Sequence, residues 1–264
     1  MPGPLIGSIL IGLTTWPISV NPYALPMPFQ TLEPQRLYRQ IAEQLRTLIG
    51  KGEFKPGARL PAERDLARQL GVSRPSVREA LIALEVEGWI EVRTGSGVFV
   101  LGRGMRRIET RKKVPDNEWG PLEILRARRV VEGEIAALAA QLAKRKDINA
   151  IRDAVELMQE DTERGIAPTM GDRAFHTAIA QAAGNAVLVD TVQTFWDARR
   201  GPLFERLGDW FENVPSWRTA IGEHEAILKA IRAHDADGAR DAMHAHMDKS
   251  HSRFTASWRK ANPS

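Results

Sequence analysis

Residues 57–101 read GARLPAERDLARQLGVSRPSVREALIALEVEGWIEVRTGSGVFVL, and this stretch decides the fold of the first half of the chain. A short helix opens at Pro61 and ends at Gly71, because proline is tolerated in a first helical turn and glycine often follows the last one. Ser73 can cap the helix over residues 74–87 by accepting hydrogen bonds from its exposed N–H groups. Two helices joined by the tight turn Gly-Val-Ser predict a helix-turn-helix motif.

A further helix and a hairpin complete this N-terminal domain. Apolar residues recur at helical spacing from Leu37 to Leu48, which predicts an amphipathic helix before the motif. Behind the motif, two short strands at 89–93 and 98–101 flank a glycine-rich turn, which predicts a β-hairpin. A hairpin in this place is a wing. The sequence therefore predicts a winged helix-turn-helix domain over residues 31–101.

Positive charge is concentrated in the same half of the chain. The formal net charge is +4, but residues 31–113 hold 17 Lys/Arg against 10 Asp/Glu, whereas the residues from 114 onward hold 20 against 23. This asymmetry indicates that only the first half meets a polyanion. A single arginine is mostly a solvated residue. Arg64, Arg74 and Arg78 together on a winged helix-turn-helix predict DNA binding, because arginine can donate two hydrogen bonds to guanine.

Four segments of this domain carry a family resemblance: 37–45 (LYRQIAEQL), 57–67 (GARLPAERDLA), 71–81 (GVSRPSVREAL) and 95–100 (GSGVFV). Together they resemble the DNA-binding domain of GntR-type bacterial transcription regulators. The resemblance implies contacts with operator bases and phosphates from Arg64, Ser73, Arg74, Ser76, Arg78, Thr94 and Gly95. Ala62 departs from the family pattern, which often has a helix-capping serine there, and the loss of such a cap costs about 1 kcal/mol.

Composition excludes several classes of protein. The 264 residues are 43% hydrophobic and 27% charged, which is typical of a globular chain of two domains. The chain has no cysteine, which excludes disulfides, thiolate metal sites and cysteine nucleophiles. We therefore expect a cytoplasmic protein that needs no oxidising compartment.

Residues 1–30 contain no charged residue. Their apolar stretch at 5–20 could be a signal or membrane segment, but no Lys or Arg precedes it and two glycines and a proline interrupt it. It is also shorter than the ~20 residues that a spanning helix needs. We expect residues 1–30 to be a disordered tail or an extension from a misplaced start, with Met27 as the alternative start and no membrane contact.

A basic linker is predicted at residues 102–120. It contains two glycines and the run Arg103, Arg106, Arg107, Arg111, Lys112 and Lys113. These charges either lie near DNA phosphates or are only solvated, and the sequence leaves both open.

The second half of the chain, residues 121–260, has helical patterning throughout. Alanine-rich stretches such as EIAALAA at 134–140 favour helix strongly. After a long first helix, we expect further helices at about 147–164, 170–183, 186–210, 215–233 and 235–260, with breaks that include Gly201-Pro202. This pattern predicts an antiparallel bundle of six or seven helices, so the whole chain is mainly α.

Four residues of this half can hold a metal ion. Asp172 and His176 are four residues apart and share one face of a predicted helix, while His224 and His246 lie on later helices. Three imidazoles and a carboxylate are sufficient to bind a divalent transition metal such as Zn, Ni or Mn, with positions left for water or a ligand. A lone histidine is more often a surface or hydrogen-bonded core residue. We place the other three in that class: His234, His244 and His251.

A second resemblance covers residues 121–255. Its segments are 125–132 (LRARRVVE), 172–180 (DRAFHTAIA), 184–185 (GN), 223–230 (EHEAILKA) and 235–246. They resemble the FCD ligand-binding domain of the FadR subgroup of GntR regulators. The resemblance implies that Asp172, His176, His224 and His246 form the metal site.

The same resemblance points to an effector, a small carboxylate that pairs with Arg128 beside the metal. Arg128 could instead form an ion pair with Asp172 or Glu132. Asn185 is either a further polar contact to the effector or a helix cap. The stretch WDARRGPLF at 196–204 resembles regulators that sense sugar acids such as uronates, which favours a sugar acid as the effector.

These observations predict a homodimeric regulator, a repressor in the commoner family arrangement, that binds a palindromic operator and responds to a carboxylate. Activation stays open. A metal-dependent enzyme is one alternative, and it would need an acid or base near the metal, for which Glu223 and Glu225 are the candidates. In the other alternative the metal itself is the signal and no organic ligand exists.

Overall fold

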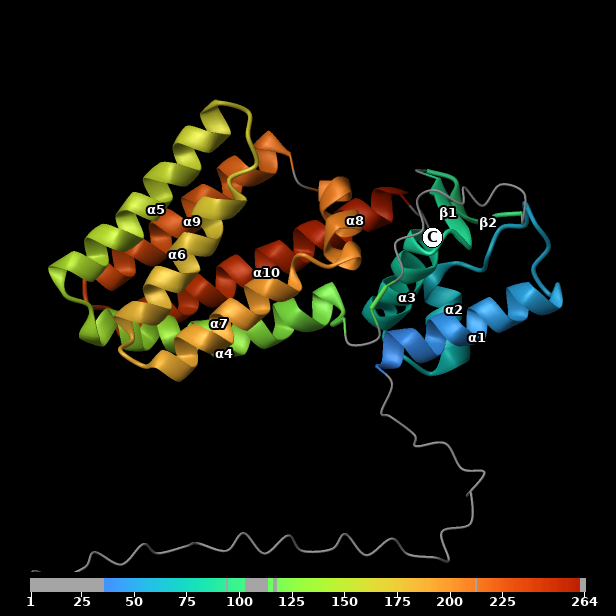
Figure 1. Ribbon diagram of the computed structural model, residues 1–264, viewed down its shortest axis with the longest axis horizontal. Helices are drawn as coiled ribbons and strands as arrows, with labels where there is room; N and C mark the ends of the chain where they lie inside the picture. Colours follow the sequence, from blue (N-terminus) through green and yellow to red (C-terminus); the bar gives the residue numbers. More distant parts are fainter. Residues whose placement is uncertain (1–35, 94, 103–113, 116–117, 212, 262–264) are drawn as a thin grey trace, which may run out of the picture. The chain divides into compact units, whose positions relative to one another are not determined.

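The structure is a computed structural model, and it describes residues 36–93, 95–102, 114–115, 118–211 and 213–261. The expected tail, Thr94 of the wing and the basic run of the linker lie outside these residues. Within the described part, ten helices and a two-stranded sheet make the protein mainly α, as predicted (Figure 1).

The N-terminal domain consists of three helices followed by a hairpin. Its elements are α1 (Leu37–Lys51), α2 (Glu63–Leu70), α3 (Arg74–Val86), β1 (Ile90–Arg93) and β2 (Gly97–Val100). The two strands are antiparallel, with Ile90 opposite Val100 and Arg93 opposite Gly97. This arrangement confirms the winged helix-turn-helix.

The two helices of the motif start differently. The hydroxyl of Ser73 accepts a hydrogen bond from the N–H of Ser76 at 3.3 Å and so caps α3, as expected. Ala62 provides no side-chain cap for α2. Glu63 and Asp65 lie in the first turn of α2 instead, where carboxylates favour the positive end of the helix dipole.

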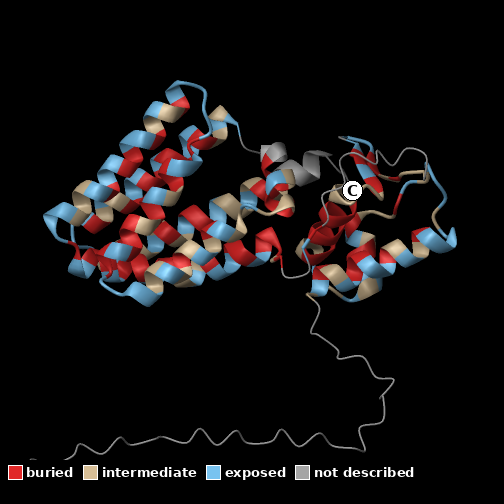
Figure 2. Cartoon of the chain, viewed as in Figure 1, coloured by how far each residue is buried: buried red, intermediate tan, exposed pale blue. Residues whose placement is uncertain are grey.

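One apolar core holds this domain together. α1 packs against α3, and Tyr38, Ile41 and Leu45 share a buried cluster with Val77 and Leu81. Figure 2 shows how the buried residues follow the middle of the domain while the outer face of α1 is exposed.

The described residues of the second domain form seven helices. They are α4 (Pro121–Leu142), α5 (Arg145–Glu163), α6 (Thr169–Ala182), α7 (Ala186–Ala198), α8 (Pro202–Phe211), α9 (Val214–Arg232) and α10 (Ala236–Ala261). Residues 186–210, expected as one helix, form two, α7 and α8, and the chain turns between them at Gly201-Pro202, one of the expected breaks.

The bundle encloses the predicted metal ligands, which lie on α6, α9 and α10. α10 packs along α4 and α9, α5 packs along α6 and α9, and α6 also contacts α4 (Figure 1). Large apolar side chains such as Met158, Phe175 and Ile227 are fully buried between them. Within the described residues, no helix has both the length and the apolar character needed to cross a bilayer.

The turn of the helix-turn-helix depends on Gly71. Its φ is +66°, in the left-handed region where a side chain costs about 1–2 kcal/mol. We expect Gly71→Ala to lower the free energy of unfolding by about that amount in urea denaturation. Gly50→Ala is the matched control, since no atom lies within 4 Å of its added Cβ and alanine favours helix by up to about 1 kcal/mol. Equal stability of the Gly71 variant and the parent would contradict this account of the turn.

Candidate functional site

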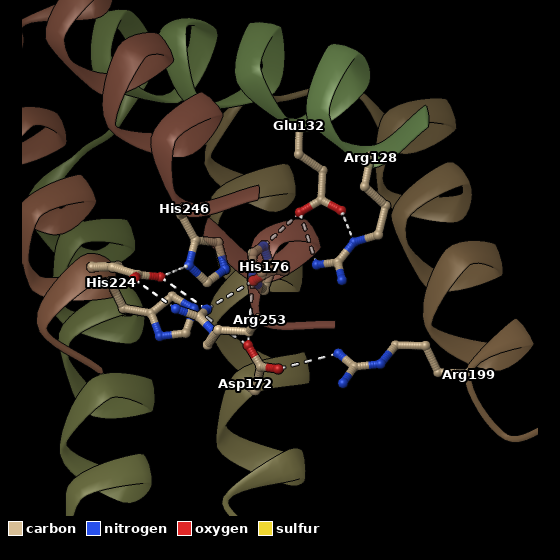
Figure 3. A network of polar contacts seen from close by, with 10 residues as sticks. Arg128, Glu132, Asp172, His176, Arg199, His224, His246 and Arg253 are labelled. Atoms are coloured by element: carbon tan, nitrogen blue, oxygen red, sulfur yellow. Dashed lines mark hydrogen bonds and ion pairs between the residues drawn. The ribbon is translucent and has the colours of Figure 1, made fainter. Parts of the chain in front are cut away.

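Four side chains meet inside the helical bundle (Figure 3). Asp172 and His176 come from α6, His224 from α9 and His246 from α10, and all four are buried. One ligand atom of each lies within 4.8 Å of the others. The Nε2 atoms of His176 and His224 are 3.4 and 3.3 Å from Oδ1 of Asp172. The structure therefore brings together the four residues that were expected to bind a metal.

Helix geometry and aromatic packing fix these positions. Asp172 lies in the first turn of α6, one turn before His176, so both side chains project from the same face. The buried ring of Phe175 packs against His176 and His224, with centroid distances of 5.4 and 4.5 Å. Trp196 of α7 covers another side of His176 at 5.6 Å. These rings keep water from the centre and limit the rotation of the imidazoles.

Two of the imidazoles each contact a glutamate through Nδ1. Nδ1 of His246 donates to Oε2 of Glu223 at 2.8 Å, and Nδ1 of His176 lies 2.5 Å from Oε2 of Glu132. Carboxylates in this position fix the tautomer and orientation of a metal-binding histidine. The Nε2 atoms of both rings are thereby left for the centre.

The carboxylates at the centre are ionised. Burial raises the pKa of Glu132, but Arg128 and His176 outweigh burial and lower it to about 2. The pKa of Glu223 is also lowered to about 2, by His246 and Arg253 against the effect of burial. The pKa of the buried Asp172 falls well below its usual value, because the nearby imidazoles of His176 and His224 and the charge of Arg199 outweigh the effect of burial.

Two of the three imidazoles are kept neutral. Burial lowers the pKa of His246 to about 3, and burial also lowers the pKa of His224. Burial acts in the same direction on His176, but the negative charge of Glu132 outweighs it and raises the pKa. Neutral imidazoles next to ionised carboxylates are the protonation states that metal binding requires.

Several atoms at the centre are buried with no hydrogen-bond partner among the described residues. They are Oδ1 of Asp172, both ring nitrogens of His224 and Nε2 of His176. An unpartnered buried polar atom costs about 1–3 kcal/mol. A cation bound between them would satisfy Oδ1 and one nitrogen of each ring, so the donor set of three nitrogens and one oxygen fits a divalent transition metal.

Each carboxylate at the centre is paired with an arginine. The pairs are Arg128 with Glu132, Arg199 with Asp172 and Arg253 with Glu223, at N–O distances of 2.5, 3.2 and 2.7 Å. The guanidinium groups of Arg128 and Arg199 also lie over the ring of Trp196, at 4.9 and 4.2 Å from its centroid. The centre is therefore close to electrically balanced without a metal ion.

A small cavity adjoins three of the four ligands, Asp172, His224 and His246, and we call it the inner cavity. Arg128, Arg199 and Arg253 line it together with Phe204 and Ser250. Arg128 lines this cavity and forms the ion pair with Glu132 that was the alternative to effector binding.

Asn185 is not part of this cavity. Its side chain is exposed and accepts a hydrogen bond from the N–H of Val187 at 3.0 Å, which caps α7. The role of helix cap accounts for Asn185, and its position gives no support to an effector contact.

The predicted DNA-contacting residues divide into exposed and buried ones. Arg64 and Arg74 have side chains that are 66% and 42% exposed, and Arg74 is also paired with Glu63. Ser73 caps α3, and Gly95 has a positive φ of +75° in the turn of the wing. Thr94 lies outside the described residues.

Arg78 and Ser76 were expected on the surface, but the structure buries both. The side chain of Arg78 is 2% exposed, and its Nε and Nη2 donate to the two carboxylate oxygens of Glu63, each at 2.9 Å. Ser76 is also buried, with its hydroxyl 2.9 Å from that of Ser73. Glu63 of α2 holds Arg78 and Arg74 at once, so in this structure Arg78 ties α2 to α3 rather than facing a DNA base.

Sequence reasoning missed the partners of the metal ligands. Arg199 lies in the segment 196–204 that resembles sensors of sugar acids, but the resemblance assigns it no role, and the sequence offers Glu132 only as a partner of Arg128. Glu223 and Glu225 were considered as acids or bases of an enzyme. Glu223 instead orients His246, and Glu225 is an exposed residue that accepts from Gln159 at 2.8 Å. No sequence spacing links Glu223 to His246, because the two lie on different helices.

The role of Glu223 gives a direct prediction. Glu223→Gln keeps the shape of the side chain but removes the charge that orients His246, so we expect metal affinity to fall about 10–100-fold in a competition assay with a chelating dye. Glu225→Gln changes a neighbouring glutamate that does not reach the centre and should leave metal affinity unchanged. Equal affinities of the two variants would show that Glu223 does not position His246.

Comparisons with known proteins agree with this architecture. Residues 37–100 match the bacterial regulatory proteins of the gntR family, and residues 123–249 match the FCD domain. The "Uxu operon transcriptional regulator" of Escherichia coli (strain K12) is 37% identical over 218 residues, which cover 81% of this chain and 85% of that protein. The "Exu regulon transcriptional regulator" of the same organism is 36% identical over 224 residues, covering 82% and 83%.

Among solved structures, that of E. coli McbR/YncC is 26% identical and covers 84% of this chain and 99% of its own, with a TM-score of 0.46. The matched relatives regulate transcription. The prediction of a DNA-binding regulator is therefore confirmed, in preference to the alternative of an enzyme. The chain belongs to the GntR family of bacterial transcription regulators, and its second half is an FCD domain.

Proposed function

We propose that this protein binds a palindromic operator as a homodimer and represses a metabolic operon until a small carboxylate binds beside a divalent metal ion. It acts in the cytoplasm, where its operator DNA lies. The observation that carries the proposal is the buried centre of Asp172, His176, His224 and His246, where several buried atoms have no hydrogen-bond partner among the described residues, in a chain that also has a helix-turn-helix.

The metal ion is Zn, Ni or Mn, held by the three histidines and Asp172. Zinc accepts nitrogen and carboxylate ligands in a tetrahedral arrangement, and nickel or manganese accepts further ligands. The ion supplies a positive charge that can bind a carboxylate. The residues around it orient the ligand and exclude water.

A carboxylate effector follows from the charge balance. The arginines already compensate Glu132, Asp172 and Glu223, so a divalent cation leaves the buried centre with excess positive charge. Because an uncompensated buried charge is costly, an anionic ligand is favoured beside the metal. The likeness of residues 196–204 to sensors of sugar acids supports a sugar acid, and the relatives named for the Uxu operon and Exu regulon support a metabolic operon as the target.

The exposed residues at the start of α2 and α3 form the proposed DNA surface. Arg64 and Arg74 reach bases or phosphates, and Ser73 with the N-terminal amides of α3 binds phosphate. Gly95 lets the wing approach the DNA backbone closely, and Thr94 joins it there. Arg78 and Ser76 reach the DNA only if the pairing of Arg78 with Glu63 opens on binding. Otherwise they hold the two helices in register.

The homodimer is supported by apolar side chains left exposed on two helices that pack together. Val130, Leu138 and Leu142 lie on α4 and Val187 lies on α7, and each of them is exposed. Apolar patches on a protein surface often mark subunit contacts. A two-fold dimer through this face matches the symmetry of a palindromic operator.

α8 connects the inner cavity with the helix-turn-helix. Phe204 of α8 lines the cavity, and Arg206 donates two hydrogen bonds to Glu85 of α3 at 3.0 and 2.8 Å. Glu85 also accepts the N–H of Val92 in the wing at 3.1 Å. A ligand that moves α8 therefore acts on α3 and on the wing together.

The proposal is tested by measuring DNA affinity with metal alone, with sugar acid alone after chelation, and with both. Operator DNA is obtained first by selection from a pool of random duplexes. We expect the affinity to fall about tenfold or more only when metal and acid are present together. His176→Ala should still bind DNA but lose stoichiometric metal and the response to the acid, whereas His244→Ala, which changes a histidine outside the centre, should behave like the parent.

Each other outcome contradicts a defined part of the proposal. A response to metal alone would make the metal the signal. Retention of full metal by the His176 variant would remove the metal site. The absence of any preference among DNA sequences at low ionic strength would overturn the regulatory function.

Arg64 provides a test of the DNA surface. Because Arg64→Ala removes one exposed positive charge, we expect weaker binding to every duplex and a decrease of about one in the slope of log affinity against log salt. Arg152→Ala removes an exposed arginine of α5 and serves as the control. If both variants show the parental slope, Arg64 does not contact a phosphate.

A further inference from the structure

The inner cavity is too small for a whole sugar acid. Its free volume is about 50 Å³. One water molecule needs about 10–15 Å³ on this scale, so the cavity has room for a few groups of that size, such as one carboxylate. Sites for small organic ligands are usually about 300–1,000 Å³. The body of an effector must therefore lie elsewhere or displace side chains.

A second cavity of about 560 Å³ lies between α6, α7 and the start of α8, and we call it the outer cavity. Its lining includes Arg173 and Thr169 of α6, Arg200 in the turn after α7 and Glu205 of α8. Its volume is in the range of a site for a small organic ligand.

Arg199 and Phe204 belong to both cavities. The guanidinium of Arg199 is 3.2 Å from Oδ2 of Asp172, a metal ligand, and it lies over Trp196, which lines the outer cavity. Arg199 and Phe204 therefore separate the two cavities. A ligand that extends from the metal into the outer cavity must pass this guanidinium.

The charges around the outer cavity indicate what it can hold. Arg173 is 2.9 Å from Asp197, Arg200 is 4.0 Å from the same carboxylate, and Arg199 is paired with Asp172. Together with Glu205, three carboxylates face three arginines, so a second anionic group gains little here. Hydroxyl groups both donate and accept hydrogen bonds, and they suit a lining of guanidinium, carboxylate and hydroxyl groups.

An apolar side chain is exposed at the same place. Met170, in the first turn of α6, is 70% exposed and lines the outer cavity. Methionine adapts its shape to a ligand at little cost. Met170 is therefore suited to cover the carbon skeleton of a bound molecule.

We propose that the effector spans both cavities, with its carboxylate between the metal and Arg199 and an uncharged, polyhydroxylated body in the outer cavity, where Arg173 and Arg200 select it. This assignment rests on the proposed function, since it places the carboxylate beside the metal. It makes Arg173, Arg200 and Met170 specificity-determining residues that do not touch the metal.

The test compares a short acid with long ones on the full-length protein loaded with Zn²⁺. Glycolate has a carboxylate and one hydroxyl and fills only the inner cavity, whereas D-gluconate, D-glucuronate and D-galacturonate also have a polyhydroxylated body. Calorimetric titration gives the affinity of each acid. We expect at least one six-carbon acid to bind about tenfold or more tightly than glycolate, because its hydroxyls bond to charged groups.

Variants of the outer cavity separate the body from the carboxylate. Arg200→Ala should weaken binding of the six-carbon acid about tenfold and leave that of glycolate unchanged. Arg164→Ala is its matched control, because Arg164 is similarly exposed (65% against 75%) and pairs with a carboxylate on its own helix. Met170→Trp fills the outer cavity from an exposed position and should have the same selective effect, with Leu157→Trp on α5 as its control.

The outcomes distinguish this inference from the proposed function. If glycolate binds in a metal-dependent manner but no six-carbon acid binds more tightly, the outer cavity does not hold the body of the effector. The same conclusion follows if the Arg200 and Met170 variants weaken both kinds of acid equally or neither. If none of the acids binds the loaded protein, the proposed function fails, and this inference fails with it.

Discussion

Three imidazoles and three carboxylates are buried together in the helical domain, and the rest of that domain depends on making this burial tolerable. Removing charged groups from water is costly unless each finds a partner. The outer atoms of the centre have partners. The Nδ1 atoms of His176 and His246 contact Glu132 and Glu223, and these two carboxylates form ion pairs with arginines. The inner atoms, which include Oδ1 of Asp172 and Nε2 of His176, lie close together around the proposed metal position instead. This division requires α4, α6, α9 and α10 to converge, and it explains why polar residues occupy the middle of an otherwise apolar bundle.

The sequence predicted most of the fold because its signals are local. Gly71, Ser73 and the glycine-rich turn at 94–97 each act within a few residues, and the helix-turn-helix and wing follow from them. The division between α7 and α8 is local too, because it falls at Gly201-Pro202, one of the breaks that the sequence indicated.

The site was predictable only in part, since its contacts join distant segments. Asp172 and His176 share a helix face because of their spacing of four, whereas His224 and His246 were connected to them only through family resemblance. For Arg78, helical spacing predicted the wrong position of the side chain. Its helical spacing from Arg74 placed it on the DNA-binding face, but Glu63, fifteen residues earlier on another helix, draws its side chain into the interior. A partner on another element cannot be inferred from periodicity.

The position of α8 limits how the two domains can influence one another. Phe204 of α8 lines the inner cavity beside the metal ligands, and Arg206 of the same helix binds Glu85 of α3. A ligand changes DNA affinity only if it binds one of two arrangements of this helix more tightly. Binding free energies are linked reciprocally, so operator DNA must then change the affinity for the effector by the same factor. Under the proposed function, the contact between Arg206 and Glu85 is therefore as important for the response to the effector as Arg199.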